Sequence, residues 1–188
     1  GTTGKPKGVI TTHKNLVFYL SALYKRLGIN QNDNYLHTAS IAFSSSNRQM
    51  WLTLSNGGTV IMATETEKVD IFQLLELILR HGVTVIDLVP SMMRRCISTL
   101  NVCKKKNSSY FDDNQIRLAL SASEALPSEI PSELRRALGK RGNEVRYINM
   151  YGLTETTGII FTYEVQSNVI DERQMSSIVP IGKPLNAV

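Results

Sequence analysis

The chain has 188 residues, 42% of them hydrophobic, which is enough to bury the core of one domain or of a large part of one. Its net charge of +5 comes without a stripe of basic residues interleaved with aromatic ones, which argues against a nucleic-acid-binding protein. The sequence also has no long apolar run of the kind that spans a bilayer and no secretory leader, so we expect neither a membrane segment nor export.

β-branched apolar runs alternate along the chain with segments of helical periodicity. In 13–27 leucines recur at three- and four-residue steps, and Gly28 follows as a helix stop. Asp70 is placed to cap a helix that Gly82 ends. The expected strands are 9–12, 35–39, 59–63, 83–89, 116–120, 145–150 and 158–163, and the expected helices are 13–27, 48–55, 70–81, 91–100 and 127–138. We expect 101–114 to be an exposed loop.

This alternation predicts an α/β fold with a mostly parallel sheet covered by helices. In open sheets of this kind, ligands bind beyond the carboxyl ends of the strands. Gly4, Asp87, Ser121 and Tyr151 lie next to such ends or in loops, so we expect one shared cleft there.

Two short motifs point to a nucleotide. Gly1–Gly8, read Gly-Thr-Thr-Gly-Lys-Pro-Lys-Gly, combines flexible glycines with hydroxyl and ammonium donors, a composition suited to phosphate. The segment 151–155, read Tyr-Gly-Leu-Thr-Glu, offers an aromatic face, a hydroxyl and a carboxylate that could ligate Mg²⁺. A Walker-type phosphate loop is disfavoured, because Pro6 stands where that motif needs a hydroxyl.

Together these motifs resemble those of the AMP-forming adenylation superfamily, which comprises acyl- and aryl-CoA synthetases, luciferases and peptide-synthetase adenylation domains. The segments 147–157 and 180–184, the latter read Pro-Ile-Gly-Lys-Pro, are similar to further motifs of that family, and the second form is typical of peptide-synthetase adenylation domains. The resemblance implies that 1–188 is the central part of the large N-terminal subdomain. The family's ribose-binding aspartate, catalytic lysine and C-terminal lid would then lie beyond Val188, and the chain alone would be inactive.

The resemblance also implies how ATP would be held. Tyr151 and Gly152 would flank the adenine, and Glu155 would ligate Mg²⁺ beside the catalytic Thr154. The alternatives are a core tyrosine at 151 and a surface acid at 155. Contacts to the phosphates are implied for Thr2, Thr3, Gly4, Lys7 and Thr154, although Lys7 could also be an ordinary surface lysine.

A further nucleotide segment departs from the family pattern. Where the family usually has two glycines before Glu-Ala-Leu, this chain has Ala122 and Ser123, followed by Glu124. The resemblance implies that Ser123 and Glu124 line the adenine, but the added side chains at a close backbone approach could shift or weaken base binding.

The acyl pocket implied by the resemblance is unusual. Phe43 retains the family's aromatic position, but Ser44 replaces the aspartate that binds the α-ammonium of amino-acid substrates. Leaving such an ammonium unpaired costs about 3–5 kcal/mol. The acid therefore either lacks an α-amine or has its ammonium bound by Asp87. Asp87 could instead form a salt bridge with Arg48, and that pairing would favour an acid without an amine. The remaining implied pocket positions are Ala119, Ser121, Met150, Gly158 and Ile159.

The sequence therefore predicts ATP- and Mg²⁺-dependent activation of a small carboxylic acid, followed by transfer to a phosphopantetheine thiol on a carrier protein. A freestanding acid–CoA ligase and an inactive nucleotide-binding module remain open as alternatives. Two cysteines outside any C-x-x-C pair and three scattered histidines predict reduced thiols, no zinc site and a cytoplasmic protein.

Overall fold

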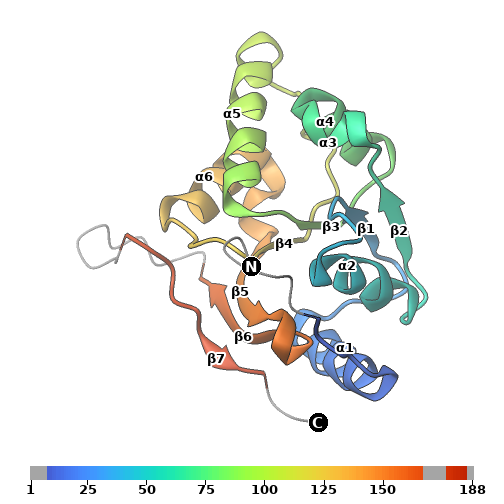
Figure 1. Ribbon diagram of the computed structural model, residues 1–188. Helices are drawn as coiled ribbons and strands as arrows, with labels where there is room; N and C mark the ends of the chain where they lie inside the picture. The colour runs from blue at the N-terminus through green and yellow to red at the C-terminus, as the bar shows by residue number, and fades with distance from the viewer. Residues whose placement is uncertain (1–7, 167–176, 186–188) are drawn as a thin grey trace.

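The computed structural model describes residues 8–166 and 177–185, which form a seven-stranded sheet with helices on both faces (Figure 1). The strand order is β2-β1-β3-β4-β5-β6-β7, with parallel pairing from β2 to β5 and antiparallel pairing at β6 and β7. The strands are β1 (Asn34–His37), β2 (Thr59–Met62), β3 (Val85–Asp87), β4 (Leu118–Ser121), β5 (Arg146–Leu153), β6 (Gly158–Val165) and β7 (Lys183–Pro184). The expectation of a mostly parallel, helix-covered sheet is confirmed.

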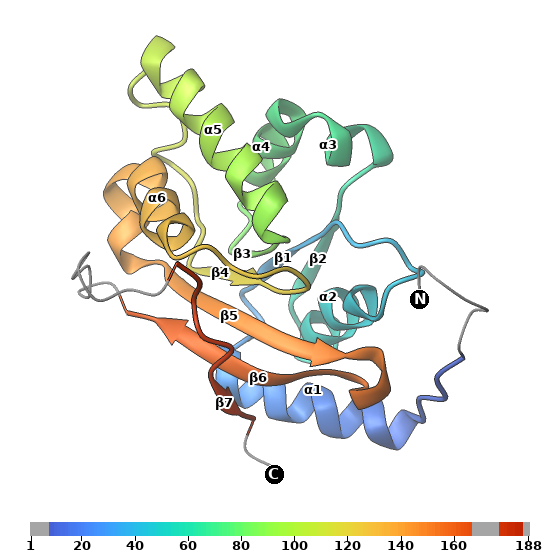
Figure 2. The same ribbon diagram turned by 60° about the vertical axis from the view of Figure 1, so that its left-hand side comes forward.

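Two layers of helices enclose the sheet, as Figure 2 shows. The helices are α1 (His13–Leu27), α2 (Ser44–Leu54), α3 (Glu65–Val69), α4 (Ile71–Arg80), α5 (Pro90–Lys106) and α6 (Glu129–Leu138), with 3-10 turns η1 (Gly139–Glu144) and η2 (Thr154–Thr156). One core packs α4, α5 and α6 against the sheet, and a second core packs α1 and α2 against the opposite face. None of the helices in the described residues is long and apolar enough to cross a membrane.

The strand order has a reversal point between β1 and β3. The connection from β1 through α2 leads to β2 at one edge, whereas the later connections through α5 and α6 lead away in the other direction. Because the helices of the two directions lie on opposite faces, the loops after β1 and β3 diverge at the carboxyl edge of the sheet. A crevice at such a point is where open α/β sheets bind ligands.

Capping residues set the helix ends that the sequence predicts. The Thr12 hydroxyl accepts a hydrogen bond from the Asn15 amide at 3.1 Å, and Gly28 ends α1 in the left-handed region at φ 67°. Asp70 caps α4 by accepting from the Phe72 amide at 3.0 Å. The predicted roles of Gly28 and Asp70 are therefore confirmed.

Other boundaries differ from the sequence prediction. Residues 9–12 form no strand: Thr12 is extended but acts as the N-cap of α1, and no described strand pairs with this segment. Helix α2 begins at Ser44 rather than at Arg48. Helix α5 continues to Lys106 through residues expected to be a loop, because lysines are good helix formers and suit the negative end of the helix dipole.

Candidate functional site: a cavity at the carboxyl edge of the sheet

A cavity of about 280 Å³ opens at the reversal point of the sheet. Its walls come from the loop after β1, helix α2, the end of β3, the start of α5 and the loop after β4. Four residues predicted for the site meet there: Phe43, Arg48, Asp87 and Ser123. Of the residues expected in one shared cleft, Asp87 lines this cavity, Ser121 and Tyr151 are not among its lining residues, and Gly4 lies outside the described residues.

A buried ion pair lies in the wall of this cavity. Arg48 on α2 pairs with Oδ2 of Asp87 at the end of β3: its Nε donates a hydrogen bond at 2.9 Å, and its Nη2 lies 2.7 Å from the same oxygen. The hydroxyl of Tyr35 on β1 donates to the same oxygen at 2.9 Å. The side chains of Arg48 and Asp87 are 5% and 3% exposed, so the two charges neutralise each other inside the protein. The alternative of a salt bridge between Arg48 and Asp87 is confirmed.

Burial and the ion pair shape the ionisation of this group. Burial alone would lower the pKa of Arg48, but the attraction of the Asp87 carboxylate outweighs it and raises that pKa above its ordinary value. Burial, reinforced by the neighbouring Asp87 charge, raises the pKa of Tyr35 well above its ordinary value. Arg48 is therefore charged and Tyr35 neutral over the whole range in which the protein would work.

Gln49, which sequence reasoning did not single out, holds three walls of the cavity together. Its Oε1 accepts hydrogen bonds from the amides of Thr38 and Ala39, each at 3.0 Å, and its Nε2 donates to the Asp87 carbonyl at 3.0 Å. The side chain is buried and joins the loop after β1 to the end of β3. A glutamine directly after Arg48 gives no signal of this role in the sequence, because it depends on three separate segments meeting.

Ser44 is the first residue of α2 and is half-buried beside the cavity-lining Phe43 and Ser45. Among the described residues that line the cavity, Asp87 is the only carboxylate, and it is already paired with Arg48. The cavity thus offers no unpaired anion from the described residues for an ammonium group.

The other predicted pocket residues lie apart from this cavity. Ala119 packs into the core beneath α4, α5 and α6, and the Ser121 hydroxyl is buried there, donating to the Leu88 carbonyl and bonded to Tyr147. This is the face opposite to Asp87. The β5–β6 positions Met150, Gly158 and Ile159 are buried on the α1 and α2 face, where a Cβ on Gly158 would meet the ring of Tyr19 at 2.6 Å.

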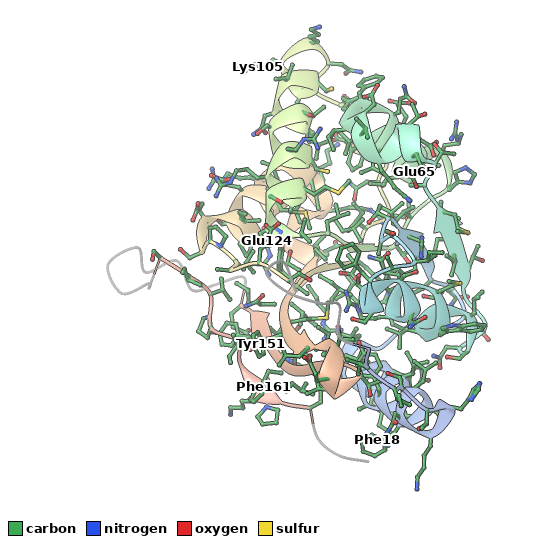
Figure 3. All side chains as sticks on the ribbon, viewed as in Figure 1. Phe18, Glu65, Lys105, Glu124, Tyr151 and Phe161 are labelled. Atoms are coloured by element: carbon green, nitrogen blue, oxygen red, sulfur yellow. The ribbon has the colours of Figure 1, made fainter. Side chains whose placement is uncertain are left out.

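The loop after β4 holds the two residues, Ala122 and Ser123, that stand where the family usually has two glycines. Ser123 has φ 72°, in the left-handed region that favours glycine, so the family's preference there has a conformational cause. Glu124 is committed elsewhere: its carboxylate accepts from the Ser91 amide at 2.9 Å and from the Ser91 hydroxyl at 2.8 Å, which caps α5. Figure 3 shows Glu124 at the foot of that helix.

The turn at the end of β5 lies at the same edge of the sheet. Tyr151 is 42% exposed and packs edge-on against Phe161 of the neighbouring strand, as seen in Figure 3. Gly152 is required for close packing, since a Cβ there would meet the Gly158 carbonyl oxygen at 2.0 Å. Thr154 and Glu155 are exposed on η2, and neither side chain bonds to another described residue.

Glu155 is therefore free to serve as a ligand, but the described residues offer it little help in binding a metal. No group of three or more histidine, cysteine or acidic side chains that could hold an ion occurs in 8–166 and 177–185. A single carboxylate suits Mg²⁺ that takes its remaining ligands from phosphates and water. The residues present thus fit a nucleotide-bound magnesium ion better than a metal held by protein alone.

The Pro-Ile-Gly-Lys-Pro segment fixes this region from the other side. The Asn149 amide donates to the Pro180 carbonyl at 2.9 Å, and β7 pairs with β6. A Cβ on Gly182 would meet the Thr162 carbonyl oxygen at 2.0 Å, so only glycine allows this approach. The motif thus has a packing role close to the Tyr151 turn.

The predicted phosphate contacts Thr2, Thr3, Gly4 and Lys7 lie outside the described residues. A second, larger groove of about 1070 Å³ runs between α1 and the start of β6, with Glu155 and Phe18 in its walls. Its described lining is mainly apolar and contains no residue of the Arg48–Asp87 cavity.

Comparison with known proteins decides the family. The model of the AMP-binding enzyme family matches residues 1–188, the whole chain. The chain belongs to this family. The predicted membership of the AMP-forming adenylation superfamily is thereby confirmed.

Relatives among peptide synthetases agree with this assignment. A linear gramicidin synthase of Brevibacillus parabrevis is 32% identical over 187 residues, which is 98% of this chain and 3% of that protein. Bacitracin synthase 2 of Bacillus licheniformis is 28% identical over 186 residues, covering 99% of this chain and 6% of that protein. The chain thus spans only a small part of the length of these relatives.

Solved structures share the fold. The nonribosomal peptide synthetase FmoA3 matches with a TM-score of 0.83 at 20% identity, over 97% of this chain and 18% of that one. The adenylation domain AlmE of Vibrio cholerae, solved with glycyl-adenosine-5'-phosphate, matches with a TM-score of 0.77 at 22% identity, over 99% of this chain and 32% of that one. The chain therefore shares the fold of the parts of these two proteins that it matches.

Proposed function

We propose that the chain forms the central part of an enzyme that uses ATP to activate a carboxylic acid as an acyl-adenylate. The observation that supports this proposal is that two features follow the carboxyl ends of strands in the same parallel part of the sheet. The cavity with Phe43, Arg48 and Asp87 follows β1 and β3, and the turn with Thr154 and Glu155 follows β5. β1 and β3 are adjacent parallel strands, and β5 follows β4 in the same parallel run, so an acid in the cavity and a nucleotide at the turn would lie at the same edge of the sheet.

The reaction has an electrostatic barrier, because the carboxylate and the ATP phosphates are both anions. A carboxylate oxygen of the acid attacks the α-phosphorus, and the bond from that phosphorus to the pyrophosphate oxygen breaks. Thr154 would donate to phosphate oxygens, and Glu155 would hold Mg²⁺, which when bound neutralises part of the phosphate charge. Tyr151, partly exposed, presents a ring on which the adenine could pack.

The acid proposed is one without an α-ammonium group. Ser44 replaces the aspartate that would bind it, and Asp87 is neutralised by Arg48 at 2.7 Å. An ammonium in this pocket would lose its hydration without gaining an unpaired anion. Fatty, aryl, keto and hydroxy acids meet this condition.

The second step proposed is transfer of the acyl group to a phosphopantetheine thiol of a carrier protein, with release of AMP. The similarity to gramicidin and bacitracin synthases supports this acceptor. Coenzyme A is the alternative acceptor. A third possibility is an inactive module, supported by the side chain of Ser123 at a left-handed position and by the commitment of Glu124 to α5.

Acid-dependent exchange of labelled pyrophosphate into ATP by the full-length protein tests the first step. We expect exchange with at least one acid that lacks an α-amine, and a loss of at least about 100-fold in Glu155→Gln. Glu144→Gln is the matched control, since Glu144 is an exposed carboxylate that precedes β5, whereas Glu155 follows that strand. No exchange with any acid, although ATP binds, would favour the inactive module. Supplying carrier domain or coenzyme A to the loaded enzyme then distinguishes the two acceptors.

A further inference from the structure

The ion pair in the cavity wall leaves two polar atoms open. The hydrogen bonds from Arg48 Nε and the Tyr35 hydroxyl and the close contact of Arg48 Nη2 all fall on Oδ2 of Asp87. Among the described residues, nothing donates to Asp87 Oδ1, and nothing accepts from Arg48 Nη1. Both side chains line the cavity of about 280 Å³.

We propose that Arg48 and Asp87 act as one neutral recognition group, selecting an acid whose far end is uncharged and both donates and accepts hydrogen bonds. A primary carboxamide matches best: its carbonyl oxygen would accept from Arg48 Nη1 and its NH₂ would donate to Asp87 Oδ1. This inference rests on the proposed function and adds to it the chemical class of the acyl group.

Charge explains why ionised groups are rejected. A carboxylate in the cavity would be attracted by Arg48 but repelled by Asp87. An ammonium would be attracted by Asp87 but repelled by Arg48. Because the net charge of the Arg48–Asp87 pair is zero, its attraction for either ion does not offset the free energy of hydration that the ion loses on entering the cavity. A carboxamide loses less hydration and gains two hydrogen bonds to charged partners, which are the stronger kind.

Size narrows the class further. A volume of about 280 Å³ lies just below the usual range for ligand pockets, so the acid has a short chain. Phe43, Val89 and Met92 contribute apolar side chains to the lining of the same cavity. The recognised acid is thus a short chain with an apolar middle and a neutral polar end.

A series of four short acids that differ at the far end tests this directly in the full-length protein. Succinamic acid carries a carboxamide, succinic acid a carboxylate, 4-oxopentanoic acid a methyl ketone that only accepts, and 4-aminobutanoic acid an ammonium. We expect kcat/KM for pyrophosphate exchange to be at least about 100-fold higher for succinamic acid than for either charged acid, which is about 2.7 kcal/mol. The methyl ketone falls between them, because it makes one of the two bonds.

Charge-changing variants provide a readout that a structural role would not give. Asp87→Asn leaves Arg48 unpaired, so succinic acid should overtake succinamic acid. Arg48→Met leaves Asp87 unpaired, so 4-aminobutanoic acid should gain relative to the others. Lys105→Gln, which removes an exposed charge on α5, should leave the ranking unchanged.

The outcomes separate this inference from the function on which it rests. Exchange with other acids in a broad panel, but no preference for succinamic acid over the charged pair, overturns the inference and leaves acid activation standing. No exchange with any acid overturns both. The ranking in the unmodified protein decides the question even where a variant fails to fold.

Discussion

The ion pair between Arg48 and Asp87 gives the most quantitative prediction for stability. In Asp87→Leu the guanidinium of Arg48, 5% exposed, keeps its charge but loses the only acidic partner found for it among the described residues. Removal of one partner from a buried pair costs about 3–5 kcal/mol. We therefore expect the melting temperature of the adenylation domain to fall by on the order of 10 °C.

The double variant Arg48→Met/Asp87→Leu separates the cost of an unpaired charge from the worth of the pair. Replacing a buried pair by apolar residues of similar size is often neutral. The Tyr35 hydroxyl then loses its acceptor, which costs about 1 kcal/mol, and Tyr35→Phe in the same background should recover it. In chemical denaturation the double variant should thus be more stable than Asp87→Leu by at least about 2 kcal/mol. Additive losses from the two single variants would refute this reasoning.

Three further predictions concern other parts of the molecule. Ser123→Gly should stabilise the domain by about 1 kcal/mol in chemical denaturation, because φ 72° is strained for serine; a loss would contradict this. Burial first, and then the Lys68 charge, lower the pKa of His37, so the unfolded state takes up the proton more readily than the native state as pH falls through 6.5. The free energy of unfolding should therefore decrease as pH falls just below 6.5, and His37→Gln should remove that part of the decrease in acid titration of stability. Burial raises the pKa of Cys96 to about 12, so in the native protein a thiol reagent at neutral pH should label the half-buried Cys103 and leave Cys96 unlabelled until unfolding.

Local patterns predicted much of the fold because they report local physics. The leucine spacing and Gly28 define α1, and Asp70 defines the start of α4, since caps and periodicity act within a few residues. Residues 9–12 have the composition of a strand, but a strand also needs a neighbour to pair with. That requirement is not visible in a short window, and the segment instead leads into the N-cap of α1.

The candidate site was predictable only in part for the same reason. The resemblance implied that Phe43, Arg48 and Asp87 are pocket residues. The sequence left open whether Arg48 and Asp87 pair with each other. The hydroxyl of Tyr35 and the amide of Gln49 reach Asp87 from two other elements, β1 and α2, and their contacts depend on how those elements pack. Ala119 likewise faces away from the cavity because strand register, which no motif reports, sets the face.

The most direct test of the account is a crystal structure of the full-length adenylation domain with a non-hydrolysable succinamoyl-adenylate analogue. The account predicts the adenine beside Tyr151 and the carboxamide within hydrogen-bonding distance of Arg48 Nη1 and Asp87 Oδ1. An acyl group bound away from the cavity lined by Phe43, Arg48 and Asp87 would contradict it.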